Sequence, residues 1–272
     1  MANSINTNPG AQVGLQNLNS INRRQDVTQN RVSTGLRVNS AVVDAASFSI
    51  AKNLSSDIGA LAAVSQGLAN AQGVTTIASA ATNAVSDLLG DINANIIAAQ
   101  NPGNTSQQQQ ILQQDFAAQI GQLNQIISSA SFNGTNLLSA GSNNVGVISN
   151  IDGSTLTIRG NGQVGNAVAT LATSDISTVS GAQAALGTLN AAAASVNTAL
   201  GNIGADTRAI GFQDQFITRL SDAQETGLGA IQDADLARDS ARLTAQRVQQ
   251  QLSVSTLNIA NSRPASIAPL FR

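Results

Sequence analysis

The chain has 272 residues, a formal net charge of −2, and no cysteine, histidine, tryptophan or tyrosine. The missing residue types exclude disulfides and thiolate metal sites and remove the commonest general base, so nothing points to an enzyme, a metal or a cofactor. The weak net charge gives no reason to expect nucleic acid binding. No stretch approaches the roughly 20 apolar residues that insertion across a membrane requires.

The surface composition favours contacts with other protein surfaces. Charged residues make up 10% of the chain, against a usual figure of about 25%. Alanine supplies much of the 42% hydrophobic fraction, and alanine favours helix while burying little area. We therefore expect helices that pack against copies of this chain, and a partly disordered secreted protein remains the alternative.

Two helices are expected in the first 100 residues. The first runs roughly from Ser4 to Val32 and ends at Gly35, where glycine can adopt a left-handed conformation. Asp44 can cap the second, which Asn101-Pro102-Gly103 ends. Its apolar residues recur at helical spacing: Leu54, Ile58, Leu61, Leu68, Val85, Leu89, Ile92 and Ile96.

A third helix and a hairpin should follow. Ser106 and Gln109 have the spacing of a capping box at the start of the helix. The period then changes, because apolar residues alternate from Val145 to Ile151 and again over 155–158, with an Asp-Gly turn between them. We expect residues 131–179 to form a small insert of β-hairpin and loop.

The remainder reads as two helices. Ser180 and Gln183 form a second capping-box pattern, and apolar residues recur every three or four positions as far as Leu220. Gly227-Leu228-Gly229 is expected to separate this helix from a terminal one, which prolines 264 and 269 should end. The predicted fold class is mainly α, a fold-back antiparallel helical bundle or coiled-coil rod with a small β-hairpin insert.

Both ends of the chain carry apolar stripes on helices that contain many polar residues. A narrow stripe of this kind suits a coiled-coil contact better than a broad core. The terminal stripe contains Ile231, Ala234, Ala241, Ala245, Val248, Leu252 and Ile259, and the opening one contains Ala11, Leu15, Leu18 and Val32. Because the pair should be marginal alone, these stripes indicate a partner.

Several short segments have a distinctive sequence. They are Ile5-Asn-Thr-Asn8, Arg31-Val-Ser-Thr-Gly-Leu-Arg-Val-Asn-Ser-Ala41 with Asp44-Ala-Ala46, Phe132-Asn-Gly-Thr-Asn-Leu-Leu138, Ala230-Ile-Gln-Asp-Ala-Asp-Leu-Ala237 and Leu270-Phe-Arg272. These segments resemble those of the bacterial flagellins. Their order and spacing cover roughly residues 1–140 and 180–272. The resemblance implies a short flagellin, without large outer domains, that polymerises into the flagellar filament used for motility.

The resemblance also implies a layered organisation and a set of partners. Residues 1–43 and 228–272 would form the inner tube, in segments that order on assembly, and residues 44–227 the middle helical domain. The implied partners are other copies of the chain, the flagellar export apparatus, an export chaperone, the filament cap and the hook-junction proteins. The first residues lack the pattern of a secretory signal peptide. Export through the flagellar apparatus would place the protein outside the cell without a cleaved leader.

The residues expected at subunit contacts or terminal-helix packing are mostly apolar. They are Leu15, Leu18, Ile21, Arg31, Arg37, Ile231, Leu243, Val248, Leu252, Leu257 and Ile259. The resemblance suggests that the two arginines hold the joint between inner and middle layers.

Two alternatives stay open at this stage. A hook–filament junction protein has the same terminal helices, and a secreted adhesin or effector has such stripes without forming a polymer. An enzyme would have to use carboxylates such as Asp233 and Asp235, which cannot share a helix face at that spacing.

Overall fold

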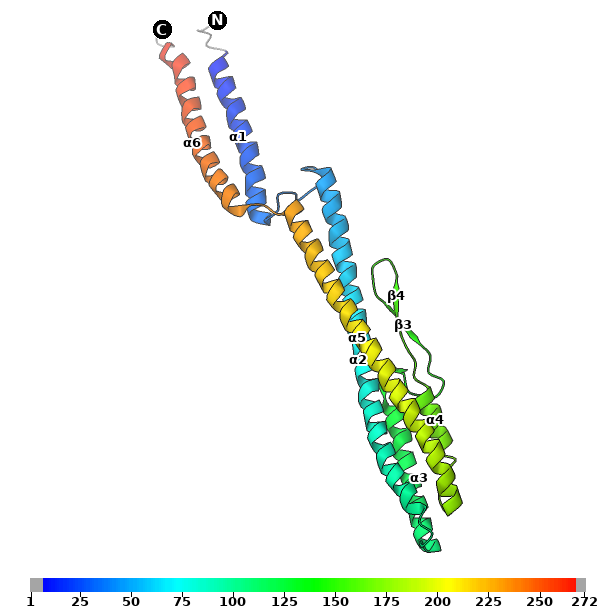
Figure 1. Ribbon diagram of the computed structural model, residues 1–272. Helices are drawn as coiled ribbons and strands as arrows, with labels where there is room; N and C mark the ends of the chain where they lie inside the picture. The colour runs from blue at the N-terminus through cyan, green and yellow to red at the C-terminus, as the bar shows by residue number, and fades with distance from the viewer. Residues whose placement is uncertain (1–6, 268–272) are drawn as a thin grey trace. The chain divides into compact units, whose positions relative to one another are not determined.

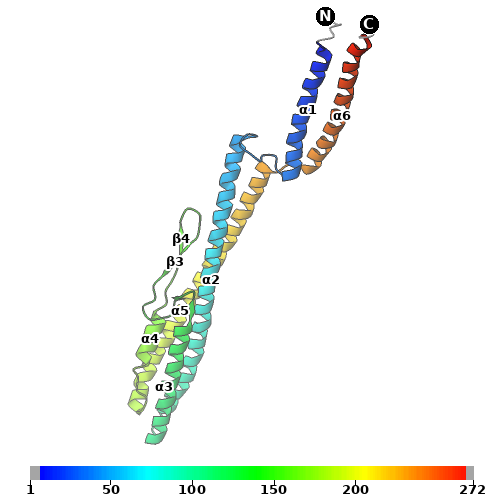
Figure 2. The same ribbon diagram turned by 180° about the vertical axis from the view of Figure 1, so that it is seen from behind.

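The computed structural model describes residues 7–267, and the chain divides into two compact units. The terminal unit comprises residues 1–56 and 223–272, and the middle unit comprises residues 57–222. Two long helices, α2 (Ala45–Ala99) and α5 (Val179–Gln232), contribute to both units. Figure 1 and Figure 2 show the helices from opposite sides.

The terminal unit is built on an antiparallel pair, α1 (Pro9–Thr34) and α6 (Leu236–Ile267). At one end Asn8 Nδ2 donates to the carbonyl of Ala260 (2.9 Å), and at the other the amide of Ala234 donates to the carbonyl of Gly35 (2.9 Å). The two helices lie side by side in both views (Figure 1, Figure 2). The sequence therefore brings its first and last helices together.

Local signals set the limits of α1 and the start of α2. Asn8 Oδ1 accepts from the amide of Ala11, and Gly35 ends α1 with a φ of 73°. The predicted end is thus confirmed, but the helix begins at Pro9 rather than Ser4, which lies outside the described residues. The hydroxyl and amide of Ser47 donate to Asp44 at 2.7 and 3.1 Å and lower the pKa of this carboxyl. The predicted cap of α2 is therefore present.

In the middle unit, α2 and α5 pair antiparallel along a heptad pattern. Ser65 Oγ donates to Asp214 Oδ1 (2.9 Å), and Gln100 Nε2 donates to the carbonyl of Ala182 (3.5 Å). Buried positions of α2 recur with alternating steps of three and four, the repeat that keeps one face toward a partner helix. These positions are Leu61, Val64, Leu68, Ala71, Thr75, Ala78, Thr82, Val85, Leu89, Ile92, Ile96 and Ala99.

The helix α3 (Ser106–Ser129) completes the core of this unit through Phe116, Ile120, Leu123 and Ile127. The capping box predicted at Ser106 and Gln109 is wrong by one residue, because Thr105 and Gln108 form it. Gln109 is buried instead, and its Nε2 donates to the carbonyl of Ala99 (2.8 Å). It thereby satisfies an otherwise free carbonyl in the last turn of α2.

The insert contains more structure than the sequence indicated. A tight pair, β1 (Ser131–Phe132) and β2 (Thr135–Asn136), precedes the predicted hairpin of β3 (Val145–Ile148) and β4 (Thr155–Ile158). An unexpected helix, α4 (Gln163–Leu171), follows and buries its apolar side chains in the core. The sequence did not predict this helix because the glycines at 160, 162 and 165 are typical of a loop. One of them, Gly165, is needed because a Cβ there would lie 2.5 Å from a backbone nitrogen.

One charged pair fixes the insert on α5. Arg159 Nη2 lies 2.7 Å from Asp206 Oδ1, and the Arg159 amide donates to Asp206 Oδ2 at 2.9 Å. The hydrogen bond to Asp206 raises the pKa of the Arg159 guanidinium above its ordinary value. At the start of the hairpin loop, Gln213 Nε2 donates to the carbonyl of Ser149 (2.7 Å). The hairpin thus has the helical support that a two-stranded ribbon requires.

Two boundaries in the second half of the chain were wrong. α5 passes through residues 227–229 and ends at Gln232, because these glycines keep helical geometry where the helix packs near Leu54. Ser180 lies inside α5, and Thr178 Oγ1 accepts from the amide of Gly181 in its place. α6 continues past Pro264 to Ile267, and Pro269, the second proline expected to end this helix, lies outside the described residues. The fold class itself, mainly α with antiparallel helix pairs and a small β-hairpin, is confirmed.

Candidate assembly surface

The facing sides of α1 and α6 form a narrow seam. On each helix the buried and half-buried positions recur at steps of three and four, as in a coiled coil. The α1–α6 seam consists of Ala11, Gly14, Leu18, Ile21, Gln25, Thr28 and Val32 of α1 and Asp239, Leu243, Gln246, Gln250, Ser253, Leu257 and Ala260 of α6.

This seam is unusually polar for a helix pair. Among its described residues only Ile21, Thr28 and Asp239 are fully buried. Gln25 Oε1 and Gln246 Oε1 are enclosed without a hydrogen-bond partner, a situation that costs about 1–3 kcal/mol per group. The seam therefore holds α1 and α6 in register without supplying much apolar stabilisation.

A second set of apolar side chains on α6 faces away from α1. They lie two residues beyond seam positions, which corresponds to about 200° around the helix. The outer α6 stripe consists of Ala241, Ala245, Val248, Leu252 and Ile259. Its three large side chains are exposed: Val248 by 50%, Leu252 by 62% and Ile259 by 64%. α6 thus presents its most hydrophobic face to the outside of the terminal unit.

The predicted contact residues fall into two sets. Leu18, Ile21, Leu243 and Leu257 lie in the α1–α6 seam, where Leu257 packs on Gly14. Exposed positions outside the seam hold the rest of the apolar set on these helices: Leu15, Val248, Leu252 and Ile259. The sequence could not separate these sets, because both have helical spacing.

The link between α5 and α6 changes the predicted terminal stripe. Ile231 is half-buried at the end of α5, and Ala234 lies in the link, because α6 begins only at Leu236. The stripe is therefore not one continuous helical face. Arg37 holds this link, since its amide donates to the carbonyl of Gln232 (2.7 Å) and its guanidinium to that of Ile231.

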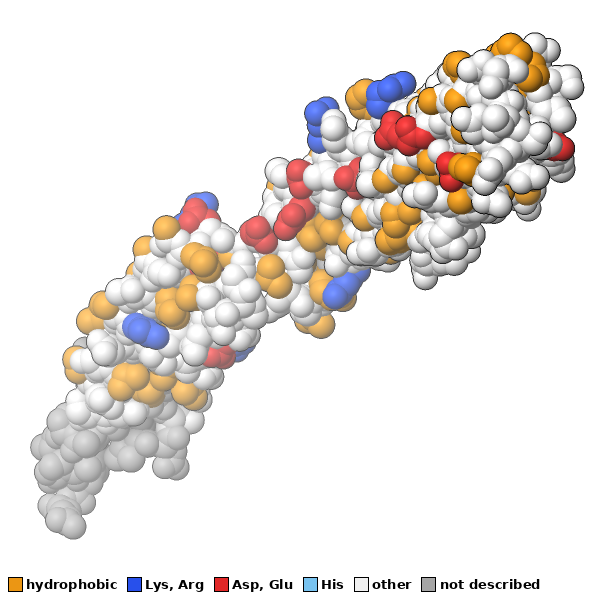
Figure 3. Space-filling model, turned by 90° about the horizontal axis from the view of Figure 1, so that it is seen from below, with side chains coloured by type: hydrophobic (Ala, Val, Ile, Leu, Met, Phe, Trp, Pro, Cys, Tyr) orange, Lys and Arg blue, Asp and Glu red, His pale blue; other side chains and the backbone are white. Residues whose placement is uncertain are grey.

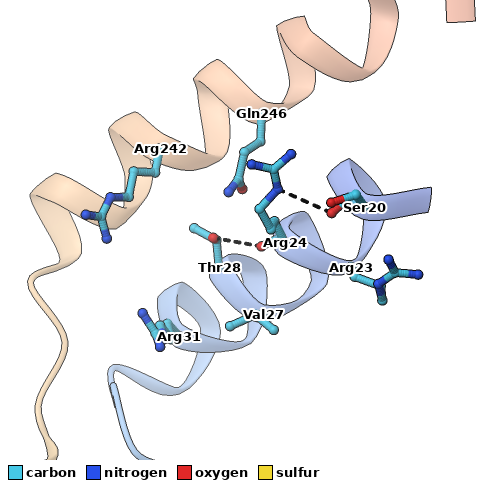
Figure 4. A pocket seen from close by; sticks show the side chains of 8 residues that line it. All are labelled: Ser20, Arg23, Arg24, Val27, Thr28, Arg31, Arg242 and Gln246. Carbon is cyan, nitrogen blue, oxygen red and sulfur yellow. Dashed lines mark hydrogen bonds between the residues drawn. The ribbon is translucent and has the colours of Figure 1, made fainter. Parts of the chain in front are cut away.

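A basic groove of about 430 Å³ lies between α1 and α6. Arg23, Arg24 and Arg31 of α1 and Arg242 of α6 are among the residues that line it, and Figure 4 shows Arg24 extending toward Gln246 of α6. Arg242 pairs with the buried Asp239 (3.3 Å), while Arg31 Nε is enclosed without a partner. Sequence reasoning missed Arg23 and Arg24, although four arginines among residues 23–37 were a visible signal.

Charge is divided unequally between the two units. The terminal unit carries ten basic and six acidic residues, a net charge of +4, and the middle unit three basic and nine acidic, a net charge of −6. Figure 3 shows that these charges are sparse among apolar and uncharged polar side chains on the visible face. Within residues 7–267 no helix is long and apolar enough to cross a membrane, and no three acidic side chains gather as a metal site.

Two family descriptions match most of the chain. The bacterial flagellin N-terminal helical region matches residues 5–143, and the bacterial flagellin C-terminal helical region matches residues 186–271. The chain belongs to the bacterial flagellin family. The segments that suggested this relationship lie in one or the other of these matches, except that the last segment extends one residue beyond the second match. The β3–β4 hairpin with α4 occupies the interval between the matches.

Relatives support the assignment over the full length. This flagellin is 33% identical to flagellin FljM of Caulobacter vibrioides over 270 residues, covering 99% of both chains. It is 36% identical to FljJ of the same organism over 281 residues, covering 100% of this chain and 99% of FljJ. Identity to a flagellin of Brucella melitensis is 33% over 286 residues, covering 99% of both.

A solved structure agrees with the fold. The crystal structure of Bacillus cereus flagellin aligns with a TM-score of 0.50 and 16% identity, covering 56% of this chain and 88% of that one. The chain is a structural subunit of the bacterial flagellar filament, and the family is a structural one. No observation favours the hook–filament junction alternative.

Proposed function

We propose that the outer α6 stripe is the surface through which the terminal units of neighbouring copies form the inner tube of the filament. The exposed face of Val248, Leu252 and Ile259 carries this proposal. Burying what remains exposed of each side chain contributes about 1–2 kcal/mol. The sum is on the order of 4 kcal/mol per subunit.

We also propose the layered organisation that the family relationship implies. Residues 1–43 and 228–272 form the inner tube, and residues 44–227 form the next layer with the 131–179 insert exposed. The basic groove adds a surface for carboxylates of neighbouring copies, because its arginines outnumber the one acidic side chain paired in it. Arg37 stabilises the end of the terminal unit close to the α5–α6 link, and the carbonyl of Arg31 accepts from the amide of Gly35 where α1 ends.

The route to the filament belongs to the same proposal. The chain is exported by the flagellar apparatus with an export chaperone, is assembled under the filament cap onto the hook-junction proteins, and is located outside the cell. Family membership and the weak terminal seam support this route, since a marginal helix pair unfolds at low cost.

Seeded polymerisation tests the central claim. Purified filaments are dissociated by heat, cooled, and mixed with sheared filament seeds, and the pelleted fraction is measured at several protein concentrations. We expect elongation above a critical concentration, with filaments visible by electron microscopy. Failure of the unmodified chain to elongate its own seeds would refute the proposed function. Export is tested separately, by comparing culture supernatants of strains with and without a working flagellar export apparatus.

A further inference from the structure

The middle unit exposes two phenylalanines on the outer face of α5. Phe212 and Phe216 lie one turn apart and are 69% and 52% exposed. Arg208 precedes them by one turn and Arg219 follows by three residues, so all four share one face. The third basic residue of this unit, Arg159, already pairs with Asp206. Exposed aromatic side chains flanked by arginine are typical of the energetic centre of a protein interface.

A complementary surface lies at the turn between α2 and α3 of the same unit. A hollow of about 490 Å³ is lined by Ile97 and Ala98 of α2 and by Ile111 and Leu112 of α3, among others. The two isoleucines are 56% and 52% exposed. The hollow is therefore open and large enough to receive aromatic rings, with these apolar side chains beside the amide side chains of Asn101, Asn104 and Gln108.

Carboxylates flank one side of this hollow. Asp91 lies two turns before Ala98 on α2, and Asp115 lies one turn after Ile111 on α3. Both are exposed, and neither takes part in an ion pair within the described chain. Asn95 Nδ2 donates to the carbonyl of Leu112 (3.2 Å), which brings these parts of the two helices to the same level.

The two surfaces are far apart within one copy. Ser65 of α2 bonds Asp214 of α5, so the phenylalanines lie near the level of residue 65. Ile97 lies farther along α2 by about 32 residues, or roughly 50 Å at 1.5 Å per residue. They cannot meet within a chain, but they meet between copies displaced by that distance along a common axis.

We propose that Phe212 and Phe216 of one copy enter the α2–α3 hollow of a second copy displaced by roughly 50 Å along the helix axis. In this register Arg219 faces Asp91 and Asp115 of the second copy, and Arg208 lies beyond the hollow. The contact joins two different surfaces of the same chain, so it repeats without closing, as a filament requires. The inference rests on the proposed self-assembly and adds the contact between middle units.

Charge reversal in a mixed polymer tests the pairing. One variant carries Arg219→Asp, and the other carries Asp91→Lys with Asp115→Lys. Each alone brings like charges together, so we expect the critical concentration for seeded elongation to rise about tenfold or more. In an equimolar mixture the two variants can alternate along the polymer. Asp at position 219 of the first variant then faces the lysines of the second, and Arg219 of the second variant faces Asp91 and Asp115 of the first. We therefore expect elongation within about threefold of the unmodified chain.

Matched variants define the outcomes further. Arg208→Asp makes the same change on the same face and should alter the critical concentration less than about threefold. Phe212→Gln with Phe216→Gln should raise it at least about tenfold without changing thermal unfolding of the monomer. If the mixture does not recover, or if Arg208→Asp equals Arg219→Asp, the pairing is overturned. If the unmodified chain elongates seeds while none of these variants is impaired, this inference fails and the proposed function stands.

Discussion

Substitution of Leu252 by aspartate separates folding of the subunit from its assembly. The side chain is 62% exposed on the outer α6 stripe. Burial of the rest of a leucine contributes about 1–2 kcal/mol, and an unpaired carboxylate in an apolar contact costs several kcal/mol more. Together they weaken each contact by at least about 3 kcal/mol, which corresponds to a critical concentration more than about 100-fold higher.

The assay is sedimentation of seeded polymer at rising protein concentration, with circular dichroism and thermal unfolding of the monomer measured in parallel. Ile148→Asp is the matched control, since it places aspartate at a 56% exposed isoleucine of the hairpin. We expect both variants to unfold like the unmodified chain and only Leu252→Asp to lose polymerisation. Filaments of normal length and yield from Leu252→Asp would contradict the assignment of the outer α6 stripe.

Three further predictions concern the folded subunit. Gly165→Ala should lower the unfolding temperature, because its Cβ would meet a backbone nitrogen at 2.5 Å, whereas Gly187→Ala, with nothing within 4 Å, should raise it slightly. Arg159→Ala should destabilise the middle unit by about 2 kcal/mol in denaturant unfolding and expose the hairpin loop to protease, because its buried carboxylate partner loses its counter-charge. The hydroxyl and amide of Ser47 lower the pKa of Asp44 in the folded chain below its ordinary value of 3.8. The stabilisation from this cap is therefore fully present above pH 3.8 and is lost as the pH falls through the lower pKa of the folded chain. The unfolding free energy of Asp44→Asn should accordingly depend less on pH below 3.8, and an unchanged slope would exclude the cap as its cause.

The long helices could be predicted because their signals are local and repeated. Apolar residues of α2 recur over many turns, so the pattern tolerates Thr75 and Thr82 at core positions, whose hydroxyls donate to carbonyls within the helix. The caps of α1 and α2 involve residues three positions apart. Such features depend little on the rest of the fold.

The predicted start of α3 was wrong because two overlapping residue pairs match the same capping signal. Thr105 with Gln108 and Ser106 with Gln109 both have the spacing of a capping box. The structure uses the first because Gln109 is needed inside, against the last turn of α2. α4 was missed for a related reason. Its glycines suit a loop, but Gly165 is required by a backbone that approaches from the preceding segment.

The sequence by itself determined the long helices, the hairpin, the family resemblance and the presence of apolar stripes at both chain ends. It did not determine which stripe faces which neighbour, because Leu243 and Leu252 have the same helical spacing pattern. Only the tertiary structure placed Leu243 in the α1–α6 seam and left Leu252 exposed. Hydrophobic periodicity records that a face will be buried, whereas the rotation of α6 about its axis, set by its packing on α1, decides which face remains for another copy.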